Sequence, residues 1–358
     1  MGPQMARDAK IEDVTGRWAP RFISNGVPLT DYQEVTGSLE TWEDWCKAWA
    51  GRAAVHEAMG REALDAGHTV SAAQHLDTAG VLYHFAKFVF VNDMDQLRTT
   101  HKKAVACRTL ALPYLDPPGE RVAIPYGGSH LYGILRKPPG IVRPPVVILC
   151  MGMDSAKEEM NSNEMHFLKR GMATLTFDGP GQGEGEYDFP ITPEYEKPVG
   201  AVLGFIDTRD DIDGTHIGIW GVSFGGYYAP RALAYHPRIR ACIAISGPFE
   251  FFSHVRDRGG LTDVFTRRSH AATHEETLAV AKRVDMSDAV KKITQPLFVV
   301  AGEHDTLTPP AHQKRLVEET QGAAVYCYLQ GGNHCANNLR HKYSPQSADW
   351  MAGHLKAQ

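Results

Sequence analysis

Length, composition and charge already exclude several classes of protein. The chain has 358 residues, 43% of them hydrophobic and 22% charged, which is close to the globular average and unlike disordered or collagen-like chains. Its 37 Lys and Arg against 42 Asp and Glu give a net charge of −5, so it offers no basic field for nucleic acid or an anionic membrane. The length exceeds one typical domain of about 100–200 residues, which predicts a large domain with an addition.

The cysteines and the first residues bear on the cellular compartment. No two cysteines have CxxC spacing, so we expect reduced thiols rather than disulfide bonds or a zinc site. Residues 1–6 lack the apolar stretch of a secretory signal, and position 6 is Ala where a myristoylation motif has Ser or Thr. No apolar run reaches the roughly 18 residues of a membrane helix. We therefore expect a cytoplasmic protein that binds neither a membrane nor nucleic acid.

Helical periodicity dominates residues 30–115. Apolar and small residues recur every three or four positions, and Pro113 should end the last helix because proline cannot continue its hydrogen-bond ladder. We expect most of the aromatic residues here to form a core, with a subset left to wall a substrate pocket. The expected helices are 41–67, 71–91 and 93–112. The aromatic residues in question are Trp42, Trp45, Trp49, Tyr83, Phe85, Phe88 and Phe90.

The pattern changes at residues 116–119, Asp-Pro-Pro-Gly, which divide a helical domain (1–118) from a second domain (119–358). In the second domain short β-type runs alternate with helical stretches, which predicts an α/β fold with a mostly parallel sheet. Residues 250–290 interrupt the alternation and are expected to form a helical excursion at the sheet edge. The predicted strands are 121–125, 131–136, 146–150, 173–178, 217–222, 241–246, 297–301 and 325–329, with helices near 156–170, 193–208, 224–235, 309–320 and 345–356.

The strongest chemical signal is the sequence Gly-Val-Ser-Phe-Gly-Gly at residues 221–226. It follows a predicted strand and opens a predicted helix, which is the setting of a G-x-S-x-G nucleophile elbow. The glycines allow a sharp turn in which strand and helix backbones approach closely, and Ser223 projects from its apex. We therefore predict that Ser223 is a nucleophile.

A serine hydroxyl is a weak nucleophile without a base to take its proton, and a carboxylate must orient that base. His334 follows the last predicted strand, in a loop that returns to the sheet edge where the elbow points. Asp305 lies just beyond the penultimate strand, whereas Glu303 is too close to the strand end. The order Ser223, Asp305, His334 is the one expected of an α/β-hydrolase.

Acyl transfer also needs hydrogen-bond donors for the developing oxyanion. We expect one to be the amide of Phe224, directly after the nucleophile, and the other the amide of Met153, in the loop after strand 146–150. In the Gly-rich residues 178–185, Pro180 breaks the helix entry and no G-x-G-x-x-G opens a helix. We therefore interpret them as a turn at the rim of the site rather than a nucleotide fingerprint. No residues have the spacing of a zinc site, and such a triad needs no cofactor.

The elbow at 221–226, the loop 151–159, the turn 178–183 and the Gly-Glu-His-Asp run at 302–305 together resemble one branch of the α/β-hydrolases. That branch includes 2,6-dihydroxypseudooxynicotine hydrolase and the fungal yellowish-green polyketide-shortening hydrolases. The resemblance covers most of the chain, and it implies an α/β-hydrolase fold with an N-terminal all-helical cap over the active site. It also implies a serine hydrolase that cleaves a carbon–carbon bond next to a ketone, although esterase relatives occur.

The resemblance further implies roles for single residues. The catalytic triad of the branch falls on Ser223, Asp305 and His334. A glutamate that influences the catalytic histidine in the nicotine-pathway enzyme is matched here by Glu250, for which a surface-loop carboxylate is the alternative.

The sequence therefore predicts a serine hydrolase that cleaves a C–C bond next to a ketone in a small aromatic or polyketide-like compound. Two alternatives stay open: a carboxylesterase that uses the same triad, and a non-catalytic binding protein with the hydrolase fold. The second usually lacks a triad member, and all three are present here. Whether the cap also forms a homodimer surface stays open.

Overall fold

The computed structural model describes residues 7–258 and 261–356 of the chain. The expectations for residues 1–6, no secretory signal and no myristoylation motif, lie outside the described residues. Within the described part, no helix is both long enough and apolar enough to cross a membrane.

The chain folds into two compact units. One comprises Met1–Glu120 together with Glu158–Ser162, and the other comprises Arg121–Lys157 together with Asn163–Gln358. The predicted domains, 1–118 and 119–358, differ from these units mainly in the short segment Glu158–Ser162, which the sequence pattern assigned to the second domain.

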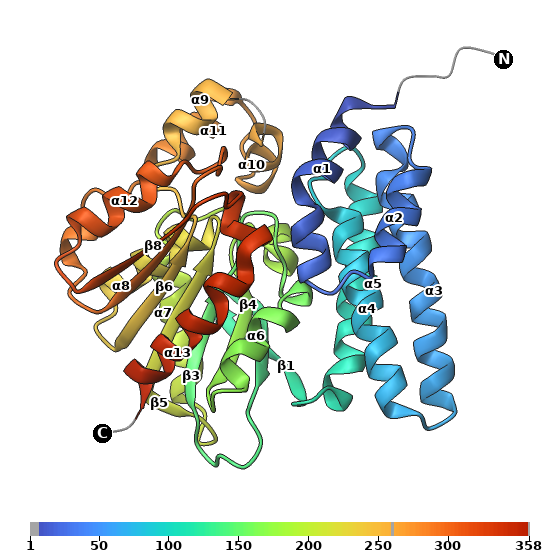
Figure 1. The fold of residues 1–358 in the computed structure, drawn as a ribbon, viewed down its shortest axis with the longest axis horizontal. Coiled ribbons are helices and arrows are strands. Elements are labelled where there is room, and N and C mark those ends of the chain that lie inside the picture. The colour runs from blue at the N-terminus through green and yellow to red at the C-terminus, as the bar shows by residue number, and fades with distance from the viewer. Residues whose placement is uncertain (1–6, 259–260, 357–358) are drawn as a thin grey trace. The chain divides into compact units, whose positions relative to one another are not determined.

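The first unit is helical (Figure 1). A 3-10 turn, Trp42–Asp44, precedes the helix that was expected from residue 41, and the Asp93 side chain caps α5 by accepting from the amides of Asp95 and Gln96. The amphipathic helix α1 was not predicted, although its buried residues have helical spacing. The helices of the first unit are α1 (Ala9–Ser24), α2 (Leu29–Ser38), α3 (Trp45–Asp65), α4 (Thr69–Lys87) and α5 (Met94–Ala111).

Aromatic side chains fill the core of the helical unit. Phe22 of α1 stacks on Phe85 of α4, with ring centroids 3.8 Å apart, and Trp42 stacks on Trp45 at 4.8 Å. The seven aromatic residues singled out in the sequence are at most 2% exposed. These mutual contacts match the expectation of an aromatic core, and a cap over the active site stays a prediction.

Buried charges join the segment Glu158–Ser162 to the helices of its unit. The fully buried Glu159 carboxylate accepts from Nη2 of Arg21 at 2.6 Å and from Nδ2 of Asn25 at 2.9 Å, and His84 lies 3.4 Å from it. Burial by itself raises the pKa of Glu159, but Arg21 and His84 outweigh burial and hold it well below its ordinary value. Paired in this way, a buried carboxylate is stable in its charged form.

The second unit contains, among the described residues, an eight-stranded sheet in the order β1-β2-β4-β3-β5-β6-β7-β8. Strand β2 pairs antiparallel with β4, and every pair from β4 and β3 to β7 and β8 is parallel. The eight predicted strands are confirmed. The apolar runs of β3, β4 and β7 match strands buried on both faces, whereas the edge strands β1 and β8 are partly exposed. The strands are β1 (Gly119–Tyr126), β2 (Ser129–Arg136), β3 (Pro145–Cys150), β4 (Ala173–Asp178), β5 (Asp213–Val222), β6 (Ile239–Ile245), β7 (Leu297–Gly302) and β8 (Ala324–Leu329).

Helices cover both faces of this sheet. Gly218 and Gly221 of β5 are three residues apart and so face opposite sides; a Cβ at Gly218 would meet Met351 of α13, and one at Gly221 would meet Ala229 of α8. The predicted excursion after β6 is helical, as expected, and forms α9 to α11. The helices are α6 (Asn161–Leu168), α7 (Glu196–Asp207), α8 (Gly225–Tyr235), α9 (Phe252–Arg258), α10 (Thr262–Arg268), α11 (His274–Arg283), α12 (Pro310–Glu319) and α13 (Ser344–Leu355).

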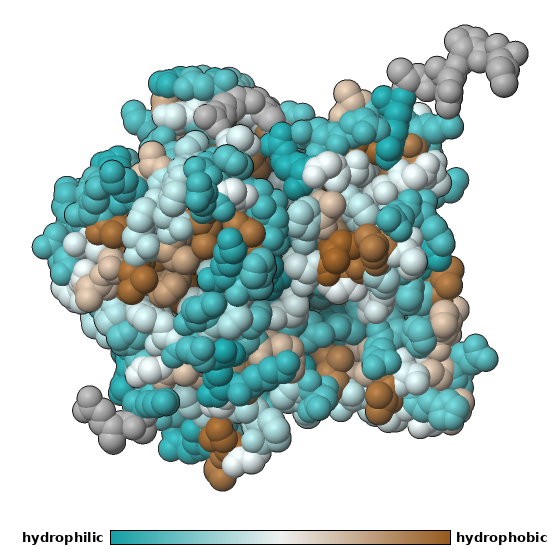
Figure 2. Space-filling view, in the orientation of Figure 1, coloured by the Kyte–Doolittle hydropathy of each residue, from teal (hydrophilic) through white to brown (hydrophobic). Residues whose placement is uncertain are grey.

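Apolar side chains are exposed at several places on the described part of the chain, among them β8, where Val325 is 41% and Tyr328 47% exposed. The segment between β2 and β3 carries Ile141, 44% exposed, and Val142, 88% exposed, and Figure 2 shows small brown areas at the tip of this segment. Single exposed apolar residues are normal on a protein surface. The chemistry is to be sought instead at the carboxyl ends of the parallel strands, where the loops after β3, β5, β6, β7 and β8 meet.

Candidate active site

The turn between β5 and α8 holds Ser223 in a strained conformation. Its φ is +56°, a left-handed value that is uncommon for a residue with a side chain. The turn is tight: a Cβ at Gly221 would lie 1.9 Å from the carbonyl oxygen of Gly225, and a Cβ at Gly225 would lie 2.1 Å from that of Cys150. The Ser223 amide donates to the Ile245 carbonyl at 2.8 Å, which fixes the apex to β6.

Three predicted residues meet at this turn. Ser223 Oγ lies 2.8 Å from His334 Nε2, and His334 Nδ1 lies 2.8 and 2.9 Å from the two oxygens of Asp305. An ionised carboxylate only accepts hydrogen bonds, so Nδ1 carries the hydrogen and Nε2 is left to accept the serine proton. The hydroxyl, imidazole and carboxylate are thus connected by a continuous chain of hydrogen bonds.

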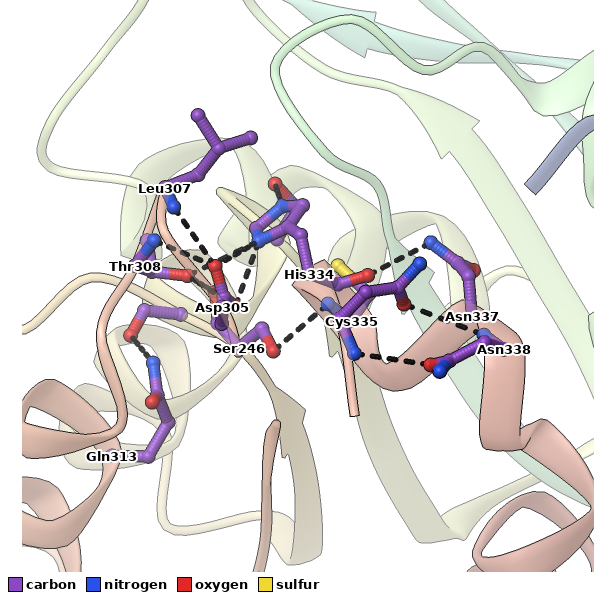
Figure 3. A network of polar contacts seen from close by, with 12 residues as sticks. Ser246, Asp305, Leu307, Thr308, Gln313, His334, Cys335, Asn337 and Asn338 are labelled. Carbon is purple, nitrogen blue, oxygen red and sulfur yellow. Dashed lines mark hydrogen bonds and ion pairs between the residues drawn. The ribbon is translucent and has the colours of Figure 1, made fainter. Parts of the chain in front are cut away.

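Backbone amides hold the Asp305 carboxylate (Figure 3). Its Oδ1 accepts from the amides of Leu307 and Thr308 at 3.0 and 2.9 Å, and its Oδ2 accepts from the Thr308 hydroxyl at 3.0 Å. Burial by itself raises the pKa of Asp305, but His334 and the donors of Thr308 outweigh burial and hold it below its ordinary value. The sequence pattern did not predict this role of Thr308. The bond from the Leu307 amide to Asp305 is an Asx turn, a common role of Asp in loops.

The loop of His334 is held on its other side. Cys335 and Ala336 have left-handed φ values of +58° and +44°, and the Cys335 amide donates to Ser246 Oγ at 3.0 Å (Figure 3). The Asn337 side chain donates to the His334 carbonyl at 3.0 Å. Burial by itself lowers the pKa of His334, but the Asp305 carboxylate outweighs burial and raises the pKa above its ordinary value.

The two predicted oxyanion donors lie beside Ser223. Met153 and Phe224 both line the pocket that contains Ser223 and His334, and the Cβ position of Gly152 is 3.1 Å from Ser223 Cβ. Within the described part of the chain, neither amide donates to a protein acceptor. Two unoccupied N–H groups beside a serine hydroxyl are suited to a developing oxyanion.

The loop that carries Met153 is held by the Gly-rich turn 178–185. Gln182, fully buried, donates from Nε2 to the carbonyls of Met151 and Gly152 at 2.5 and 2.7 Å, and its Oε1 accepts from the Tyr195 hydroxyl at 2.7 Å. The turn therefore lies at the rim of the site. The sequence pattern gave Gln182 no role.

The pocket beside Ser223 is mostly apolar. Its walls come from the elbow, from the segment between β6 and β7, and from the loops after β3, β7 and β8. The segment between β6 and β7 places His254 among aromatic and aliphatic side chains. Phe251 packs edge-on against Phe224, with ring centroids 5.0 Å apart, and stacks on His254 at 4.8 Å. Among the described residues around Ser223 we find no cluster of three metal-ligating side chains.

Glu250 is not brought to the triad. Its Oε2 accepts from the Ser253 amide at 3.0 Å, at the start of α9, and its backbone bridges that of Asp285. No hydrogen bond or ion pair joins Glu250 to His334 among the described residues. Glu303, the other carboxylate near Asp305, accepts from the Gly331 amide at 2.8 Å, and the neighbouring His304 is exposed.

A nucleophile elbow and a line of hydroxyl, imidazole and carboxylate, at the carboxyl edge of a mostly parallel sheet, define an α/β-hydrolase. The profile of the prolyl oligopeptidase family matches residues 159–358. The chain belongs to this family of α/β-hydrolases, and it is an enzyme.

Relatives cover most of the chain. The 2,6-dihydropseudooxynicotine hydrolase of Paenarthrobacter nicotinovorans is 31% identical over 364 residues, which cover 96% of this chain and 92% of that protein. The crystal structure of 2,6-dihydroxy-pseudo-oxynicotine hydrolase has a TM-score of 0.86 at 29% identity, over 94% of this chain and 95% of that one. The 20-hydroxy-prefusarin hydrolase FUS2 of Gibberella moniliformis is 31% identical over 236 residues, 60% of this chain and 55% of its own length. The resemblance seen in the sequence is confirmed.

Proposed function

We propose that the protein is a serine hydrolase in which Ser223 is the nucleophile, His334 the base and Asp305 the acid that orients the base. One observation carries the proposal: the contact of 2.8 Å between Ser223 Oγ and His334 Nε2 continues through Nδ1 to Asp305. A hydroxyl placed in this way can pass its proton to Nε2 as it attacks a carbonyl carbon. The amides of Phe224 and Met153 then stabilise the oxyanion.

We propose that the substrate is a ketone and that the enzyme cleaves the C–C bond next to the carbonyl group. Attack by Ser223 gives a tetrahedral intermediate, whose collapse breaks that bond. The electron pair stays on the leaving carbon, which takes the proton from His334 Nε2. Water then hydrolyses the acyl ester of Ser223 to a carboxylic acid and the free hydroxyl, and no cofactor takes part.

Two features support a small aromatic or polyketide-like substrate. The pocket walls are apolar, with Phe224, Phe251 and Leu307 among them. The relative that aligns over 96% of the chain is a 2,6-dihydropseudooxynicotine hydrolase. A leaving carbon must bear negative or enol character, so hydroxylated aryl ketones and 1,3-diketones are the expected substrates.

A carboxylesterase is the competing function, because the same geometry serves an ester. Paired kinetics on hydroxylated aryl ketones, β-diketones and short aryl esters, with wild type and Ser223→Ala, separate the two. We expect ketone cleavage by the wild type and a loss of about 10⁴-fold or more in kcat for Ser223→Ala. A loss below about a hundredfold would contradict a nucleophilic serine. Ester turnover without ketone cleavage would establish the esterase instead.

The cytoplasmic location stays a proposal that rests on the sequence alone, and whether the chain forms a homodimer stays open. Light scattering on the purified full chain measures the oligomeric state directly.

A further inference from the structure

Arg268, at the end of α10, is a buried cation that joins three segments far apart in the chain. Its guanidinium donates from Nη2 to Asp154 Oδ1 at 2.6 Å, from Nη1 to Glu186 Oε2 at 2.5 Å, and from Nη1 to the Gly181 carbonyl at 3.2 Å. The Arg268 side chain is 4% exposed, and the side chains of Asp154 and Glu186 are 8% and 5% exposed. The carbonyl of Arg268 also accepts from the Ile191 amide at 2.9 Å.

Asp154 directly follows Met153, whose amide is the second oxyanion donor of the proposed function. Consecutive Cα atoms are about 3.8 Å apart, so the position of Asp154 fixes where the Met153 peptide can lie. We propose that Arg268 is a positioning residue for the oxyanion site: it holds Asp154, and thereby the Met153 amide, where the developing oxyanion needs a donor. This inference rests on the proposed function.

A second arm of Arg268 reaches the same loop from the other side. Glu186 and the Gly181 carbonyl belong to the turn that carries Gln182, and Gln182 donates to the carbonyls of Met151 and Gly152. One guanidinium thus holds the loop directly through Asp154 and indirectly through the turn. The guanidinium is a planar fork with several fixed donors, so it can hold two carboxylates at set positions and angles.

Stability alone is a weak reason for such a cluster. A buried ion pair often contributes no more than well-packed apolar side chains would, because burying the charges costs as much as their attraction returns. A donor that is misplaced by about 1 Å, in contrast, can slow an enzyme about a hundredfold. The placement of Arg268 therefore serves the reaction in addition to the fold.

The segment that carries Arg268 also borders the pocket. Leu261, just before α10, lines it, and Phe265 of α10 packs on Phe224 with ring centroids 6.0 Å apart and on Phe251 at 5.0 Å. The helix that packs against two aromatic residues of the pocket wall is therefore the one that holds the oxyanion loop.

The test compares Arg268→Met and Asp154→Ala with wild type on the substrate that the wild type cleaves. We expect kcat to fall about 10- to 100-fold in both variants, with KM within about threefold, because a misplaced oxyanion donor weakens the transition state more than the bound substrate. Arg267→Met is the matched control: Arg267 is the preceding residue of the same helix but is exposed, and its kcat should stay within about twofold.

Two further measurements separate positioning from folding. Arg268→Met leaves two buried carboxylates without this cation, which favours misfolding. Asp154→Ala leaves Arg268 paired with Glu186 and is expected to fold. Phenylboronic acid forms a tetrahedral adduct with the serine, so its Ki should rise about as much as kcat/KM falls. The double variant should lose no more than the larger single loss, because both changes break one contact.

A folded Asp154→Ala enzyme with kcat within about threefold of wild type and an unchanged boronate Ki would overturn the inference. The same holds for losses that multiply in the double variant. If Ser223→Ala keeps its activity, the proposed function itself fails. If Ser223→Ala is inactive and Asp154→Ala is not impaired, only the role of Arg268 fails.

Discussion

On one side of Ser223, Asp305 and His334 are held largely by groups close to them in the chain. On the other side, the oxyanion loop 151–155 is held by side chains from distant segments. Asp305 accepts from residues two and three positions later, and the His334 carbonyl accepts from Asn337. The oxyanion loop is held by Gln182 and, through Asp154, by Arg268. Contacts of the first kind leave a pattern in the sequence, whereas contacts of the second kind depend on the fold.

The largest effect is expected for Asp305→Asn, which removes the carboxylate that holds His334. We expect kcat to fall about 10⁴-fold, because the amide no longer holds the imidazole in the tautomer that accepts the serine proton. The carboxylate also raises the pKa of His334, and only the neutral imidazole is a base. The acid limb of the kcat/KM profile of Asp305→Asn should therefore move to lower pH, which pH-dependent kinetics on the residual activity measures.

Glu303→Gln is the matched control, since it neutralises the neighbouring carboxylate of the same loop. Glu303 bonds the Gly331 amide and no member of the triad, so kcat should stay within about threefold. If the two variants lost equal activity, Asp305 would not be the acid.

A smaller effect is expected for Gln182→Met, which removes two of the hydrogen bonds that hold the oxyanion loop. The change frees two buried carbonyls of the loop, so we expect kcat to fall about tenfold and stability to fall by about 1–3 kcal/mol. Gln313→Met is the control, because Gln313 is a similarly buried glutamine that donates at 2.8 Å to the Gly247 carbonyl instead (Figure 3). Equal kcat losses at equal stability losses would show that Gln182 acts only through folding.

The smallest effect is expected for Glu250→Gln, which sharpens the boundary of the acid–histidine side. The carboxylate caps α9 and does not contact His334, so kcat should stay within about threefold and the pH profile should not move. A shifted acid limb would instead restore Glu250 to the site as the auxiliary carboxylate that the family resemblance implies.

Much of the fold could be predicted from the sequence, and less of the site's support. The eight strands have apolar runs between turn residues. The glycines of the elbow indicate the tight turn that brings β5 and α8 close together. The helix α1 was missed although Ile11, Val14, Trp18 and Phe22 recur at helical spacing and are buried. Arg268 and Gln182 could not be assigned, because nothing near them in the chain shows which loop they reach. Glu250 was placed by analogy, and its orientation depends on where α9 begins.

The segment Glu158–Ser162 has a consequence for how such a gene can be rearranged. Because these residues fold with the helices, the helical unit is encoded in two separate stretches, and one of them interrupts the hydrolase sequence. A truncation at residue 120 would remove Arg21, Asn25 and His84 and leave the Glu159 carboxylate without the groups that now offset its burial. Recombination between relatives would therefore have to exchange both stretches together. The two units cannot be exchanged as independent, continuous segments of the gene.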